Sequence, residues 1–155
     1  MKDSPQGWPR ITSVVCYEDP VKAIDWLCRA FGFEVRMKIE GEGGRIVHSE
    51  LEFGDGLIIV AGAGGVYATQ SPWCTRYASP ASVGGKTTQS LCIYVDDVDA
   101  HHNRAKAAGA TVFYEPKNSD YGDDYWEDRT YGVLDLEGHV WGFIERIRNP
   151  KPHGS

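Results

Sequence analysis

The sequence predicts an α+β fold that uses one strand-helix-strand-strand-strand (βαβββ) module twice. Residues 90–112 repeat residues 13–35 at an offset of 77 without gaps. Residues 128–146 repeat residues 44–62 at an offset of 84, and both of these segments turn at a glycine. An internal repeat of this length indicates one supersecondary unit present in two copies.

The first copy contains clear signals for each element. Residues 11–17 are rich in β-branched side chains, which favours a strand. Asp19 and Pro20 then predict a helix, with Asp19 as the N-cap and Pro20 in the first helical position. Gly32 is expected to end that helix, and residues 33–39 are expected to form the second strand.

The hairpin that closes each copy is most distinct in the second, DRTYGVLDLEGHVWGFIER (128–146), which predicts two strands joined at Gly138. The second copy carries seven extra residues, which fall around 118–127. Each module has one helix to cover one sheet face. We therefore expect a curved, cup-like mixed sheet of about eight strands with the helices outside.

The chain is long enough for one domain with a sizeable core. We predict a single domain, 1–155, in which module 11–62 and module 88–146 are joined by the loop 63–87. That loop is rich in Gly and Pro and carries several aromatic residues. A connection this long indicates either a binding loop or an inter-module linker.

Composition excludes several classes of protein. Sixteen Lys and Arg against 22 Asp and Glu give a net charge of -6, which argues against a nucleic-acid partner. The charge is explained either by solubility or by a cationic ligand. No apolar run is long enough to span a membrane, and the N-terminus lacks a signal-peptide core, so a cytoplasmic location is expected. The four cysteines contain no C-x-x-C pair and are expected to be reduced.

Three motifs resemble those of the vicinal oxygen chelate (glyoxalase/bleomycin resistance/dioxygenase) superfamily. They are YVDDVDA (94–100), AAGA (107–110) and DRTYGVLDLEGHVW (128–141). The resemblance covers about residues 11–146. It implies paired modules that form a ligand cup, often in a homodimer, with functions that vary widely between members.

The resemblance also implies where a metal would lie, because metal-using members take His, Glu or Gln ligands from the first and last strand of each module. The corresponding positions here are Thr12 or Ser13, Ile58, Gln89 or Ser90, and Gly142. Only Gln89 could act even as a weak ligand. We therefore expect neither the usual metal centre nor another cofactor.

His48 and Glu50 are the candidate catalytic residues. They alternate with apolar residues along one strand, so both are expected on one face of the sheet. Such a pair could bind a metal or act as an acid and a base. The alternative is a structural, hydrogen-bonded histidine beside an exposed glutamate. His101 and His102 on the second helix are expected to be solvated.

The function expected from these patterns is metal-free binding of a small molecule, cationic or aromatic and drug-like, by a bleomycin-resistance-like protein. Stacking walls would come from the aromatic residues of the two long loops. The candidate ligand-binding residues are Trp73, Gln89, Cys92, Tyr94, Tyr121, Tyr125 and Trp126. The alternative is a glyoxalase-like lyase or isomerase, or a dioxygenase, with a non-standard site around His48 and Glu50.

Overall fold

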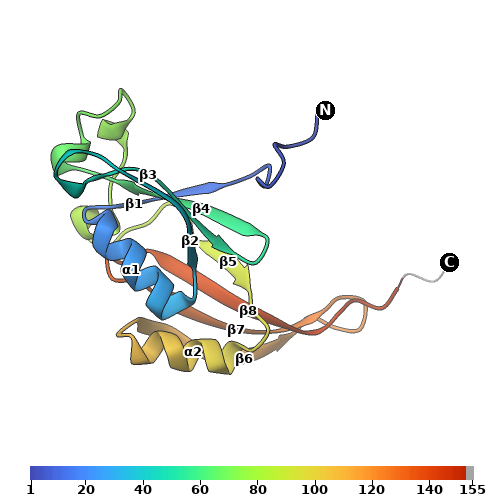
Figure 1. The fold of residues 1–155 in the computed structure, drawn as a ribbon. Helices are drawn as coiled ribbons and strands as arrows, with labels where there is room; N and C mark the ends of the chain where they lie inside the picture. Colours follow the sequence, from blue (N-terminus) through green and yellow to red (C-terminus); the bar gives the residue numbers. More distant parts are fainter. Residues whose placement is uncertain (153–155) are drawn as a thin grey trace. The chain divides into compact units, whose positions relative to one another are not determined.

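A computed structural model describes residues 1–152 of the chain. They form two compact units, divided between Lys86 and Thr87, and each has one α-helix and one four-stranded mixed sheet (Figure 1). The α+β class and the two βαβββ modules are thereby confirmed. The eight strands form two sheets of four. The single domain expected from the sequence stays a prediction.

The first unit follows the expected order of elements, with short 3₁₀ turns after the last strand. Its elements are β1 (Ser13–Tyr17), α1 (Pro20–Phe31), β2 (Glu34–Glu40), β3 (Ile46–Phe53) and β4 (Gly56–Gly62). The strands lie in the order β1-β4-β3-β2. β1 and β4 are parallel, and the other neighbours are antiparallel.

The second unit repeats this arrangement. Its elements are β5 (Leu91–Tyr94), α2 (Val98–Ala107), β6 (Thr111–Asp120), β7 (Glu127–Leu134) and β8 (Val140–Arg148). The strands lie in the order β5-β8-β7-β6, with β5 and β8 parallel. Part of the extra segment 118–127 extends the β6–β7 hairpin, since Asn118 pairs with Arg129 and Asp120 with Glu127.

The caps of α1 are those that the sequence predicts. The Asp19 side chain accepts a hydrogen bond from the backbone N–H of Lys22, Pro20 occupies the first turn, and Gly32 ends the helix in the left-handed conformation, with φ at 85°. The buried face of α1 packs on β1, β3 and β4. Within the described residues, neither α-helix is long and apolar enough to cross a membrane.

The core of the second unit is aromatic. Trp141, Phe143 and Tyr131 are completely buried, and the Trp141 and Phe143 rings are stacked. The ring of His101 lies 4.0 Å from that of Phe143, and its Nδ1 lies 2.6 Å from the Tyr131 hydroxyl. His102 is 9% exposed. The expectation of solvated histidines is therefore wrong, because α2 turns both rings toward buried or part-buried partners.

Candidate functional site

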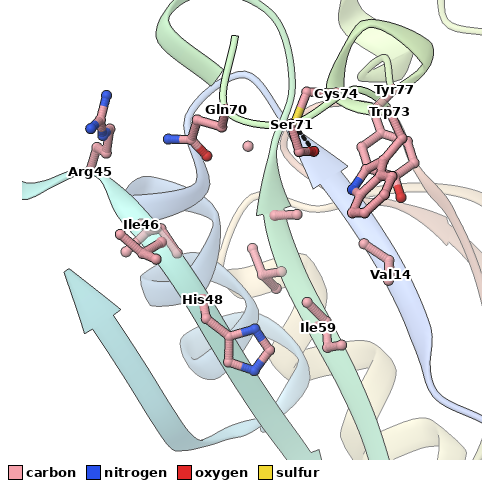
Figure 2. Close-up of a pocket in the computed structure, with 14 residues that line it drawn as sticks. Val14, Arg45, Ile46, His48, Ile59, Gln70, Ser71, Trp73, Cys74 and Tyr77 are labelled. Atoms are coloured by element: carbon pink, nitrogen blue, oxygen red, sulfur yellow. Dashed lines mark hydrogen bonds between the residues drawn. The ribbon is translucent and has the colours of Figure 1, made fainter. Parts of the chain in front are cut away.

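A cavity of about 570 Å³ lies in the first unit, between its sheet and the segment that follows β4 (Figure 2). This volume is typical of small-molecule sites, which span roughly 300–1,000 Å³. The lining residues come from β1, β3, β4 and the loop 63–87. They are Val14, Arg45, Ile46, Val47, His48, Ile59, Val60, Ala61, Gly62, Gln70, Ser71, Trp73, Cys74 and Tyr77.

Strand register places an apolar floor under the cavity. Val14 on β1 pairs with Ile59 on β4, and Ile59 pairs with Glu50 on β3. Directly paired residues share a sheet face, so these three side chains point the same way, and His48 joins them two residues along β3. The residues that alternate with them along the strands point to the other face of the sheet. Leu51 is one of these, and it has no exposed surface.

A β-bulge brings a cation into the same cavity. Ile39 pairs with His48 while the next residue, Glu40, pairs with Ile46, so Val47 is an extra residue in β3. Strict alternation would place Arg45 and His48, three residues apart, on opposite faces. The extra residue shifts the alternation by one. Both side chains therefore line the cavity.

Tyr67 attaches the segment that follows β4 to the sheet. Its ring lies against Gly62, where an added Cβ would come within 2.2 Å of ring atoms, and its hydroxyl accepts a hydrogen bond from the Ile46 N–H. Beyond Tyr67 the chain forms short turns that carry Trp73 and Tyr77. The Trp73 side chain remains 59% exposed, so it is not a core anchor.

His48 and Glu50 form a hydrogen-bonded pair. His48 Nε2 lies 3.0 Å from Glu50 Oε1, and the same oxygen accepts a hydrogen bond of 3.2 Å from the Trp8 indole N–H. The Arg36 guanidinium lies 3.6 Å from the other carboxylate oxygen and stacks 4.0 Å over the Trp8 ring. Glu50 is 6% exposed, so the alternative of an exposed glutamate is wrong.

This cluster lowers the pKa of Glu50 below its ordinary value of 4.5, chiefly through the hydrogen bond from His48, with a further contribution from Trp8. A lowered folded-state pKa stabilises the fold above the unfolded pKa, and this stabilisation is lost as pH falls through the folded pKa. Glu50→Gln should therefore cost about 1–2 kcal/mol at pH 7 and clearly less at pH 3. Urea unfolding at both pH values tests this, and an equal cost at both would contradict it.

The Cys16 thiol near the cavity is not activated. Burial, with a smaller effect of Cys74, raises the pKa of the Cys16 thiol to about 11, so Cys16 is protonated at neutral pH. Cys74 Sγ lies 3.0 Å from the Ser71 hydroxyl. No disulfide joins the four cysteines, which all fall within the described part of the chain, as the sequence predicts.

The donor set does not fit the family's metal. Ser13 and Ile58 are direct partners in the β1–β4 pair, and Gly142 pairs with Cys92 rather than with Ser90, two residues from the place that the repeat predicts. An added Cβ on Gly142 would lie 3.5 Å from Cys92 Sγ. Across residues 1–152, no three His, Cys, Asp or Glu side chains lie close enough to hold a metal ion.

The sequence-predicted ligand residues fall into two groups. Trp73 and His48 line the cavity. Glu50 does not line it, but it is hydrogen-bonded to His48. The candidates of the second unit do not belong to this cavity. Tyr94 and Trp126 flank Arg146, whose guanidinium lies 5.3 and 5.5 Å from their rings.

The remaining second-unit candidates surround that cluster or lie on the neighbouring strand. The rings of Tyr121 and Tyr125 lie 5.3 and 6.2 Å from that of Trp126. Gln89 and Cys92 are exposed; Gln89 lies two residues before β5, and Cys92 lies within that strand. Their role in ligand binding stays a prediction.

Sequence reasoning missed Arg45 and the aliphatic floor residues Val14 and Ile59. The floor follows from β-alternation, but its membership depends on strand register, which the sequence does not state. Tyr77, one of the loop aromatics expected to supply stacking walls, does line the cavity. Arg45 carried a signal only as the residue that aligns with Arg129 in the repeat.

Two βαβββ units in one chain define an α+β protein built from a repeated module. Residues 10–143 match the family model described as "Glyoxalase/Bleomycin resistance protein/Dioxygenase superfamily". The chain belongs to that superfamily, which confirms the resemblance seen in its motifs.

The chain is also similar to several individual proteins. TioX from Micromonospora sp. ML1 has a solved structure that is 32% identical, with a TM-score of 0.67 over 90% of this chain and 100% of that one. A family enzyme from Burkholderia phytofirmans PsJN, 20% identical with a TM-score of 0.63 over 86% and 95% of the two chains, shows the fold alone. An uncharacterized protein of Mycobacterium bovis is 28% identical over 90% of this chain and 85% of its own length.

Proposed function

We propose that this protein binds a small, planar aromatic molecule in the cavity of the first unit and does so without a metal centre. The observation that carries the proposal is the exposed Trp73 ring at the margin of a cavity with an aliphatic floor. Aromatic side chains gain most from stacking when a second flat ring covers them. The positions where metal-using relatives hold their ion offer no ligand set, which supports the metal-free form of the proposal.

Calorimetric titration with bicyclic aromatic probes tests this function. We expect wild-type protein to bind naphthalene derivatives, and we expect Trp73→Leu to weaken the binding about tenfold, which corresponds to about 1.4 kcal/mol. Val66→Ala is the matched control, because Val66 lies in the same loop, is 62% exposed and does not line the cavity. Its affinity should equal that of wild type.

Two results would contradict the proposal. One is the absence of binding by every member of a broad panel of aromatic probes. The other is a loss of binding in Trp126→Leu with none in Trp73→Leu, which would transfer the site to the aromatic cluster of the second unit. A homodimer, which the resemblance implies, is a separate prediction that light scattering would test.

A second candidate function is acid–base chemistry by His48. Its ring lines the cavity while Glu50 holds one ring nitrogen, an arrangement typical of an oriented general base. Such a group could exchange a proton next to a carbonyl, as in lyase or isomerase chemistry. NMR of deuterium exchange in aryl α-hydroxy ketones tests this role. Exchange in wild type that is lost in His48→Gln would support it, and equal rates would exclude it.

A further inference from the structure

Among the described residues that line the cavity, Arg45 is the one with a shielded side-chain donor that has no hydrogen-bond partner. Its Nε is shielded from water and has no hydrogen-bond partner, and Arg45 forms no ion pair with any residue that the structure describes. Leaving a shielded N–H without an acceptor is costly, so such a donor in a cavity indicates a missing acceptor.

The other arginines near carboxylates behave differently. Each of them is paired with an acidic side chain of its own unit, at N–O distances between 2.5 and 3.6 Å. They are Arg29 with Asp25, Arg36 with Glu50, Arg129 with Asp99, Arg146 with Asp128, and Arg148 with Asp120. Arg45 thus stands apart in lining a cavity without a carboxylate to neutralise it.

The local charge of the cavity is opposite to that of the chain. Its lining includes Arg45 and His48, and none of the described residues that line it is Asp or Glu. The net charge of -6 is therefore carried outside the cavity. The net charge of the whole chain, which would suit a cationic or neutral ligand, is no guide at this site, because binding depends on the groups that face the ligand.

The charged residues and the Trp73 ring lie on different sides of the cavity. Arg45 and His48 belong to the β3 side, Ile59 lies on β4 in the middle, and Val14 lies on β1, where Figure 2 shows the Trp73 ring. Two strand spacings amount to about 9–10 Å. A bicyclic aromatic ring spans such a distance across the strands.

We infer that the ligand of this cavity is a planar aromatic acid, whose carboxylate is bound by Arg45 and whose ring covers the aliphatic floor beside Trp73. This inference rests on the proposed function and specifies its ligand class. The guanidinium fork matches a carboxylate better than any other common group. The Gln70 side chain, which lines the cavity near Arg45 in Figure 2, offers a further polar contact.

Three probes that share one ring test the inference. They are naphthoate, naphthamide and naphthylmethylammonium, titrated by calorimetry into wild type, Arg45→Gln and Arg45→Lys. Wild type should bind naphthoate at least tenfold more tightly than naphthamide and bind the ammonium probe most weakly. Arg45→Gln should lose about tenfold for naphthoate and less than twofold for naphthamide, and Arg45→Lys should retain part of the preference.

Arg76→Gln is the matched control, since Arg76 is an arginine of the loop 63–87 that borders the cavity, is exposed and does not line the cavity. It should leave the preference for naphthoate unchanged. The preference should also persist in about 0.5 M salt, because a partly shielded pair is screened less than surface charges. Circular dichroism confirms that each variant is folded, and the wild-type preference is informative without any variant.

The outcomes separate the two proposals. Wild type that binds none of the three probes would overturn both. Equal affinity for naphthoate and naphthamide would overturn the acid preference and leave aromatic binding in place. Equal losses of naphthoate affinity in Arg45→Gln and Arg76→Gln would indicate general electrostatic attraction and would also overturn the inference.

Discussion

Replacing Asp135 by alanine is expected to destabilise the protein by about 3 kcal/mol. Asp135 is 6% exposed and is the first residue of the turn between β7 and β8. Its Oδ1 accepts hydrogen bonds from the backbone N–H groups of Glu137 and His139, and its Oδ2 accepts one from the Trp141 indole. Alanine would remove the acceptor of these three hydrogen bonds, and the Trp141 side chain is completely buried.

Urea unfolding measures the cost of Asp135→Ala. The matched control is Asp55→Ala in the β3–β4 turn of the first unit, where the aspartate is exposed. That variant should remain within about 0.5 kcal/mol of wild type. Asp135→Asn should lie between the two, because the amide oxygen replaces only part of the acceptor capacity. An Asp135→Ala protein as stable as wild type would show that the turn does not depend on this carboxylate.

Gly62→Ala is expected to cost a similar amount, about 3 kcal/mol, and to weaken binding of aromatic probes as well. The new Cβ would lie 2.2 Å from the Tyr67 ring, far below van der Waals contact. Tyr67 would have to move, which would break the hydrogen bond from the Ile46 N–H to its hydroxyl. The segment that carries Trp73 begins at this contact, so the cavity should change with it.

Gly142→Ala provides the comparison. Gly142 is also a strand glycine, yet an added Cβ there would meet Cys92 Sγ at 3.5 Å and the Leu91 carbonyl oxygen at 3.9 Å, which are ordinary contacts. We expect its midpoint of thermal unfolding to stay near that of wild type. In a Tyr67→Leu background, Gly62→Ala should cost less than in wild type, because the clashing ring is gone. Additive effects of the two substitutions would contradict the proposed ring contact.

Much of the fold follows from local sequence signals. The repeat and the Asp19-Pro20 helix start each specify geometry within a few residues, and both are confirmed. Such signals are reliable because backbone periodicity and capping depend on near neighbours. Membership of the superfamily was visible in the motifs for the same reason, since they mark turns and helix ends.

The register of the paired strands was less predictable than the elements themselves. The repeat aligns Ser90 with Ser13, yet Gly142 pairs with Cys92, two residues further along. A shift by two keeps every side chain on its face, so no hydrophobic pattern reports it. The bulge at Val47 could not be predicted from the sequence for a different reason. An extra residue does not change the type of residues in a strand, but it changes the sheet face on which the residues beyond it lie.

The sequence by itself determined the duplicated βαβββ plan, the superfamily and the pairing of His48 with Glu50 on one strand face. Tertiary structure decided which residues share the cavity. Arg45 reaches it through a bulge, Trp73 through the Tyr67–Gly62 contact, and Val14 through the β1–β4 register. The physical reason is that these neighbours are fixed by packing between distant segments, whereas a pattern along the chain records only the preferences of each segment.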